Sequence, residues 1–298
     1  MEQNNKNSIG MQIEKIVISH SPTLAEVELI CKGIFYDNFI KIQDEVKQIV
    51  DCRIQEFSEK LFEKLEKINL FDMNKFKIPD IQYNLYQAQN AYVRTENEEK
   101  RDIIIEIIAS RINSEEESNL QLNYNQAIEL LPKINKKHID ILTFLFFINE
   151  VGVTYLENIQ MPKDKEQLIR YLDTLMQFIN FEITGNDLRY LSSCGCGTFN
   201  LPNLLEERLI RNSATMFEFK EQKGLKKIGE VPNIIINGKE MSIREYIISL
   251  DAKYKILFEK YNESKLCEFR MSSIAALIGL KNLEIKINDK LDAYQWFG

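Results

Sequence analysis

The chain runs through residues 23–78 without a proline and with a single glycine, Gly33. Proline and glycine are the residues that most often end regular structure, so this stretch favours long helices. Apolar side chains recur at spacings of three and four from Phe35 to Ile68, with a change of phase near Cys52. This heptad-like stripe predicts one long amphipathic N-terminal helix that bends near residue 52 or pairs with another long helix.

Further helical patterns follow, as expected for a chain of 298 residues with only six prolines and eleven glycines. Two capping boxes, Thr23 with Glu26 and Ser242 with Glu245, mark helix starts. Asn135 is a candidate N-cap for one of the middle helices. Beyond the long helix, we expect helices at about 79–94, 98–113, 115–131, 136–150, 164–181, 203–217, 242–265 and 272–281.

Strand signals are few. Residues 11–18 predict a short N-terminal strand, and residues 233–238 predict a strand that ends in an Asn-Gly turn. Residues 283–287 are a possible partner strand. The predicted fold is therefore mainly α and multi-helical, with one long amphipathic N-terminal helix, a short N-terminal strand and minor β structure in the C-terminal half.

A polar junction at Lys163 and Asp164 is the best candidate for a boundary between the two halves of the chain. We therefore expect an N-terminal strand arm at residues 1–22 and a helical domain containing the long helix at residues 23–162. A C-terminal, mainly helical domain would occupy residues 163–298.

Charge and cysteine content limit the partners and the compartment. The net charge of -7 gives no general attraction to nucleic acid, so nucleic-acid binding is not indicated. Five cysteines, an odd number without disulfide-framework spacing, together with a polar N-terminus, predict a cytoplasmic protein with free thiols. The longest apolar run, Ile141 to Ile148, is too short for a membrane span.

Cys194 and Cys196 form the most unusual motif, Cys-Gly-Cys-Gly. Two thiols this close could hold a soft metal or act as a redox switch, although zinc sites use Cys-x-x-Cys with a second pair. A tight turn permitted by glycine is the favoured interpretation. The two histidines, His20 and His138, lie in no nucleophile motif, and surface or structural roles are expected for both.

No recognisable catalytic motif accompanies the many carboxylates. No phosphate-binding glycine loop and no His-Glu-x-x-His motif occurs, so the catalytic residues are unknown and no metal or cofactor is expected. The run Glu115 to Glu117 suits a helix start, where acidic side chains favour the positive end of the helix dipole. The protein is expected not to be an enzyme.

A lone strand and a long apolar stripe both require a partner, and a second copy of the chain would supply one. The alternative is that both fold back on their own chain. If they associate between chains, a homo-oligomer interface would include Ile13, Ile16, Ile18, Phe35, Phe39, Ile42, Val46 and Ile49.

Four stretches resemble an uncharacterised bacterial family known by locus-tag names. Residues 7–12 are similar to its Asn-Ser-Thr-x-Ile-Gln opening, residues 34–39 to its Phe-x-x-Asn-Phe element and residues 80–133 to its central helices. Residues 271–279 are similar to its Leu-Thr-Pro-Val-Gly-Ile-Ala-Ile-Gly segment, but Ser273 and Ala275 depart from that pattern, which puts the family's turn in doubt here. The middle stretch also resembles the Abi-alpha family of abortive phage infection. The resemblance implies helical architecture and a defence context, with no catalytic residue to transfer.

Three hypotheses for function follow. The first is a non-enzymatic, oligomer-forming interaction protein in anti-phage defence, with a phage-encoded or neighbouring-gene protein as a possible partner. The second is a hydrolase or nuclease with an unrecognised carboxylate site, which would need acidic side chains with raised pKa values in one cleft. The third is a coiled-coil structural scaffold.

Overall fold

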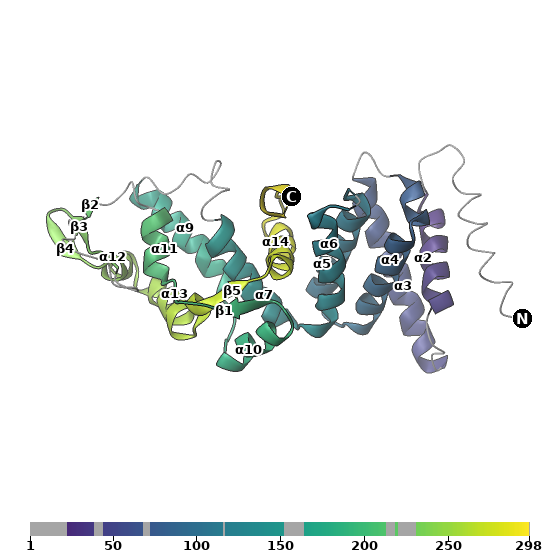
Figure 1. The fold of residues 1–298 in the computed structure, drawn as a ribbon, viewed down its shortest axis with the longest axis horizontal. Helices are drawn as coiled ribbons and strands as arrows, with labels where there is room; N and C mark the ends of the chain where they lie inside the picture. The colour runs from purple at the N-terminus through teal and green to yellow at the C-terminus, as the bar shows by residue number, and fades with distance from the viewer. Residues whose placement is uncertain are drawn as a thin grey trace, which may run out of the picture. The chain divides into compact units, whose positions relative to one another are not determined.

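The structure is a computed structural model that describes residues 23–38, 44–67, 72–115, 117–151, 164–212, 218–219 and 231–297 (Figure 1). It is mainly helical with a few short strands, as the helical periodicity predicted. The chain divides into two units, residues 1–136 with 287–298, and residues 137–286. The boundary predicted between residues 162 and 163 lies at the end of a stretch, 152–163, that is outside the described residues, and it stays a prediction.

The first unit is a set of helices that pack side by side (Figure 1). The helix α4 packs against α2, α3, α5 and α6, and α5 packs against α3, α4 and α6. Short 3-10 turns precede α4 and follow α6. The elements are α2 (Leu24–Asn38), α3 (Asp44–Glu66), η1 (Met73–Lys77), α4 (Pro79–Arg94), α5 (Glu98–Asn113), α6 (Asn119–Leu130), η2 (Leu131–Lys133) and the C-terminal α15 (Tyr294–Phe297).

The structure does not support one continuous N-terminal helix. Instead, α2 and α3 are separate helices that pack against each other. Phe35 of α2 shares a buried cluster with Val50 and Ile54 of α3 and Val93 of α4. The two parts of the apolar stripe are thus partners within one chain. The helix α3 continues through the change of phase near Cys52 without interruption. The predicted strand at residues 11–18 lies outside the described residues.

Helix starts in this unit follow local capping chemistry. Thr23 and Glu26 form the predicted capping box, in which the Thr23 backbone N–H donates to Glu26 Oε2 at 2.8 Å. Asn97 Oδ1 accepts from the Lys100 backbone N–H at 2.8 Å and begins α5 as predicted. The helix α6 begins later than predicted, because the Ser118 side chain caps it.

The second unit combines helices with two small antiparallel sheets. Two π-helical turns, η3 (Phe147–Val151) and η6 (Glu259–Glu263), extend α7 and α13. The remaining helices are α7 (Lys136–Phe146), α9 (Lys165–Phe178), α10 (Gly185–Ser193), α11 (Leu205–Asn212), α12 (Ile243–Leu250), η5 (Ala252–Tyr254), α13 (Lys255–Phe258), η7 (Leu266–Glu268) and α14 (Ser273–Ile287). Within the described residues, no helix is both long and apolar enough to span a membrane.

One sheet contains β1 (Gly197–Phe199) and β5 (Phe269–Met271), with Thr198 opposite Arg270. The other contains β2 (Glu218–Phe219), β3 (Ile234–Ile236) and β4 (Lys239–Met241) in that order. The predicted Asn-Gly turn is confirmed between β3 and β4, where Asn237 and Gly238 have φ of 51° and 76°. These left-handed conformations are the ones that a two-residue hairpin loop of this type requires.

Two predicted elements of this unit are corrected. Residues 283–287 do not form a strand but end α14, where Leu283 is buried on the helix, because the apolar run beginning at Ala275 continues with helical spacing. The helix expected at residues 242–265 is divided into several shorter ones. Asp251 interrupts it, because its side chain accepts from the Lys253 backbone N–H and starts a new turn.

Candidate functional site

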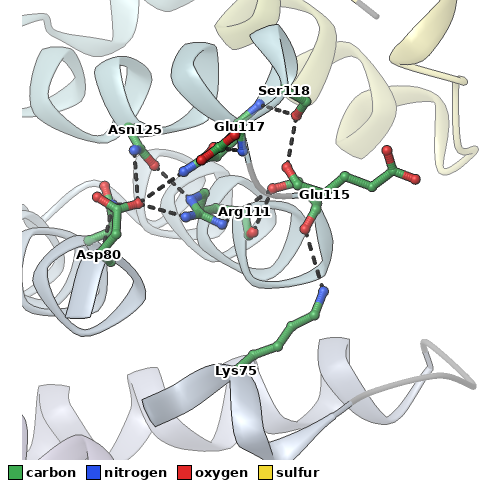
Figure 2. A network of polar contacts seen from close by, with 10 residues as sticks. Lys75, Asp80, Arg111, Glu115, Glu117, Ser118 and Asn125 are labelled. Atoms are coloured by element: carbon green, nitrogen blue, oxygen red, sulfur yellow. Dashed lines mark hydrogen bonds and ion pairs between the residues drawn. The ribbon is translucent and has the colours of Figure 1, made fainter. Parts of the chain in front are cut away.

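Arg111 of α5 is the centre of the polar network of the first unit (Figure 2). Its side chain is fully buried, with 0% exposure. The guanidinium donates from Nη2 to Asp80 Oδ2 at 2.6 Å and from Nε to Asn125 Oδ1 at 2.7 Å. A buried guanidinium requires such partners, since an unpaired charge away from water is strongly unfavourable.

The Asp80 carboxylate accepts hydrogen bonds from side chains on three helices. Its Oδ2 also accepts from Asn125 Nδ2 at 3.0 Å and from Gln121 Nε2 at 3.3 Å, both on α6. Burial alone would raise the pKa of Asp80, but the hydrogen bonds from Arg111 and Asn125 outweigh it and hold the pKa below its ordinary value. The carboxylate therefore stays charged and links α4, α5 and α6.

At the edge of this network, side chains form hydrogen bonds with backbone groups. The Glu117 backbone N–H donates to Gln121 Oε1 at 2.6 Å, and Ser118 Oγ donates to the Glu115 carbonyl at 2.9 Å. Lys75 approaches the Ser114 carbonyl at 3.5 Å, as Figure 2 shows. The predicted role of Glu115 and Glu117 near a helix start agrees with their position just before α6. The arrangement positions α4, α5 and α6 relative to one another.

A second carboxylate, the buried Glu106 of α5, binds two lysines. It forms ion pairs with Lys64 of α3 and with Lys290 of the C-terminal segment, residues 287–298. Burial acts to raise the pKa of Glu106, but hydrogen bonds from Lys290 and Lys64 lower it overall. The C-terminal segment is held further by the buried side chains of Leu291 and Phe297. Glu106 thus joins both chain regions that make up the first unit.

In the second unit, the buried residues His138 and Asp187 form a polar cluster, and an aromatic ring stacks on His138. His138 Nε2 lies 3.5 Å from Asp187 Oδ1, and its ring stacks on Tyr190 with 5.2 Å between centroids. Lys137 Nζ lies 2.6 Å from the same Asp187 oxygen. Thr184 donates to the other oxygen, so that Asp187 also completes the capping box of α10.

The environment of this cluster lowers the pKa values of both Asp187 and His138. Burial would raise the pKa of Asp187, but hydrogen bonds from Lys137 and Thr184 lower the pKa to about 2. Burial lowers the pKa of His138, against the attraction of Asp187. The pair therefore consists of a charged carboxylate beside an imidazole that is neutral at pH 7. The structural role expected for His138 agrees with its burial, whereas His20 lies outside the described residues.

The turn after α10 carries the two predicted thiols. Gly195 has φ of 82°, the left-handed conformation that favours glycine, and the Cys196 backbone N–H donates to the Leu191 carbonyl at 2.9 Å. These features are those of a glycine-terminated helix end. Cys194 is partly exposed and Cys196 is buried, and burial raises the pKa of Cys196 to about 12. In the described residues, no group of three or more His, Cys, Asp or Glu side chains could hold a metal ion.

The described residues of the predicted oligomer interface have different environments. Phe35 is fully buried in the core of its own chain, so its apolar side chain is accounted for without a second copy. Ile49 is 52% exposed on α3. Val46 belongs to α3, but its side chain is not described. The other predicted positions lie outside the described residues: Ile13, Ile16, Ile18, Phe39 and Ile42.

Sequence reasoning missed the charged residues of the polar networks. A signal for Arg111 was available, since it follows Ile107 and Ile108 at helical spacing and shares their buried face. No comparable local signal identifies Asp80 as the partner of Arg111, or Asp187 as the partner of Lys137 and His138, because these contacts join distant parts of the chain. The importance of these charged residues could therefore be recognised only from the folded structure.

The described residues define a mainly helical protein of two units, in which Arg111, Glu106 and Asp187 are each paired with an opposite charge. A family model described only by a locus-tag name matches residues 21–240, more than half of the 298 residues. The chain belongs to this uncharacterised family. No curated protein and no solved structure matches the chain.

Proposed function

We propose that this protein is a non-enzymatic interaction protein that forms homo-oligomers and acts in anti-phage defence of the abortive-infection type. The observation that carries the proposal is the exposure of Ile49 on α3. Its neighbour Val50 is buried in the chain's own core, but 52% of Ile49 faces solvent. Covering such a side chain is favourable by roughly 25 cal/mol per Å² of apolar surface, so a second copy could bind there.

Exposed apolar side chains also occur on the neighbouring helix α2. Leu24 and Leu29 are 37% and 46% exposed, and α2 packs against α3 within the first unit. Single exposed apolar residues are common on proteins, but three on two adjacent helices favour an interaction surface. We therefore place the proposed homo-oligomer contact on α2 and α3.

The carboxylates support an interaction role over the hydrolase or nuclease alternative. Asp80 and Glu106 are paired with cationic side chains, as is Asp187 in the second unit. Among the described residues, each carboxylate with a resolved shift has a lowered pKa: Asp80, Glu106, Asp173, Asp187 and Glu245. A carboxyl group that donates a proton in catalysis near pH 7 needs the opposite shift.

The defence context rests on sequence. The family is uncharacterised, so its membership names no activity. The resemblance of residues 80–133 to the Abi-alpha family supports a role in abortive infection. A phage-encoded protein or the product of a neighbouring gene would then act as the trigger, and the oligomer would act by binding.

The oligomer is tested by native mass spectrometry of the full chain over a range of micromolar concentrations. We expect the wild-type protein to appear at a multiple of its 35.0 kDa chain mass. Ile49→Asp should shift it to the monomer, because the new charge would be desolvated in the contact. The matched control is Gln48→Asp, which adds the same charge to an exposed neighbouring position and should leave the oligomer intact. A monomeric wild-type protein would contradict the oligomer.

The defence role is tested separately by plating a panel of phages on cells that carry the gene with its native neighbours. We expect fewer plaques for some phages than with an empty vector, and restored plaques with Ile49→Asp at equal expression. Plaque counts equal to the empty vector for every phage would contradict defence. Loss of the oligomer without loss of protection would show that the two parts of the proposal are independent.

A further inference from the structure

The Cys194–Cys196 turn joins a partly exposed thiol to a buried one within a single helix end. The Cys194 backbone N–H donates to the Tyr190 carbonyl at 3.0 Å, and that of Gly195 donates to the Ser192 carbonyl at 3.0 Å. One residue separates the cysteines, so their Cα atoms lie within about 7 Å of each other. That separation is within reach of a disulfide once the turn adjusts, since disulfides span roughly 4.4–6.8 Å between Cα atoms.

The two thiols differ in access. Cys194 is partly exposed, and the Tyr190 hydroxyl is its hydrogen-bonding neighbour, a contact that raises the pKa of Tyr190. The thiolate is the form of cysteine that reacts with oxidants, and its access to them depends on exposure of the sulfur. Cys196 is fully buried. An exposed thiol that reacts first, beside a second that responds, is the arrangement of an attacking and a resolving cysteine.

We propose that Cys194 and Cys196 are a hydroperoxide-responsive thiol pair, in which Cys194 is oxidised first and Cys196 closes an intramolecular disulfide. This modification site is independent of the proposed oligomer and of the defence role. It gives a chemical use to the Cys-Gly-Cys motif.

The chemistry proceeds in two balanced steps. The Cys194 thiolate attacks one peroxide oxygen, the O–O bond breaks, and the departing oxygen takes a proton to leave as an alcohol or water. Cys194 becomes a sulfenic acid, so its sulfur is oxidised and the peroxide is reduced. Cys196 then loses its proton and attacks the Cys194 sulfur. The S–S bond forms, the S–O bond breaks, and the hydroxyl leaves with the proton as water.

Formation of the disulfide would affect neighbouring elements, because the turn is hydrogen-bonded to the residue that precedes α14. The Ser272 backbone N–H donates to the Cys196 carbonyl at 2.9 Å, and Ser272 Oγ donates to the Gly195 carbonyl at 2.8 Å. The next residue, Gly197, packs so closely on β5 that an added Cβ would lie 2.2 Å from the Arg270 carbonyl oxygen. Cys196 must leave its buried position to reach Cys194, so the disulfide would loosen these contacts.

The test uses the full chain with hydrogen peroxide as the probe. After a short exposure, free thiols are blocked with N-ethylmaleimide, and the protein is digested with trypsin for mass spectrometry. Both cysteines fall in the peptide of residues 190–208, between Arg189 and Arg208. We expect this peptide to lose the mass of two hydrogen atoms, to take up no label, and to recover two labels after dithiothreitol. Cys52, which is exposed, is the internal comparison and should remain labelled.

Two variants keep the proposal falsifiable. In Cys196→Ser, Cys194 should accumulate as a sulfenic acid that dimedone traps; in Cys194→Ser, buried Cys196 should stay reduced. Oxidation of Cys52 while residues 194 and 196 keep both labels would overturn the proposal. So would a wild-type peptide that gains oxygen without forming the disulfide. Because the wild-type measurement needs no variant, a folding defect in Cys196→Ser does not affect the result.

Discussion

Arg111 Nη2 and Asp80 Oδ2 lie 2.6 Å apart across α5 and α4, with the arginine fully buried and the aspartate side chain 42% exposed. The pair therefore connects the interior of the first unit to its surface. Asn125 bridges both partners, since it accepts from Arg111 and donates to Asp80. Arg111, Asp80 and Asn125 therefore form a closed ring of hydrogen bonds that includes the buried guanidinium.

Replacing Asp80 with alanine should destabilise the first unit, because it leaves the Arg111 guanidinium buried with fewer partners. Breaking a fully buried pair costs about 3–5 kcal/mol, and the exposure of Asp80 reduces the expected loss to about 2 kcal/mol. Urea unfolding measures the loss. Glu129→Ala, an exposed acidic position on α6, is the matched control and should change stability by less than about 0.5 kcal/mol. Equal midpoints for the two variants would contradict the role of the pair.

Acid should destabilise the second unit through Asp187. Its pKa is lowered in the folded state to about 2 from 3.8, so the unfolded chain binds a proton at higher pH than the folded one. The stabilisation is complete above about pH 4 and is lost as the pH falls toward 2, an effect on the order of 2 kcal/mol. In Asp187→Asn this contribution is absent at every pH.

The measurement is the free energy of unfolding of wild-type protein and of Asp187→Asn from pH 7 to pH 2. The difference between them should be greatest at neutral pH and should shrink below pH 4. A difference that stays constant across this range would show that the Asp187 charge does not stabilise the fold. Asp289→Asn, at an exposed position in the C-terminal segment, serves as the control.

Gly279 allows α14 to approach α7 closely. A Cβ at this position would lie 2.7 Å from the Leu142 carbonyl oxygen and 2.9 Å from Phe146 Cβ. Gly279→Ala should therefore lower stability by about 1–3 kcal/mol through overpacking. Gly185→Ala is the control, because nothing lies within 4 Å of its added Cβ. Thermal unfolding should give a lower midpoint for Gly279→Ala only; the same midpoint for both would refute the close approach.

Local chemistry made part of the fold predictable. The helices α4 and α5 match the expected ranges because Pro79 and Asn97 mark their starts in ways that depend on neighbouring residues alone. The division of the N-terminal stripe was not predictable, since heptad spacing is satisfied equally by a partner from the same chain or from another. The strand expected at residues 283–287 failed for a related reason: a run of a few alternating residues also fits the end of a helix.

The candidate site was less predictable than the fold. Cys194 and Cys196 are separated by one residue in the sequence, so their motif was visible, and Gly195 has the conformation that a glycine turn requires. His138 and Asp187 come together only through the packing of α7 and α10, and nothing in the spacing between them indicates a contact. Charged pairs separated by many residues depend on how the chain folds back, which single-sequence periodicity does not specify.

The first unit is assembled from two separate parts of the chain, because residues 287–298 belong to it although residues 137–286 do not. A ribosome adds these last residues after the whole second unit has been made. Until then Glu106 has only Lys64 of its two lysine partners, and the place of Leu291 and Phe297 against the first unit is unfilled. During synthesis the second unit, which is continuous, can therefore fold before the first is complete. Removal of residues 287–298 would therefore leave incomplete a unit whose larger part precedes the second unit in the chain.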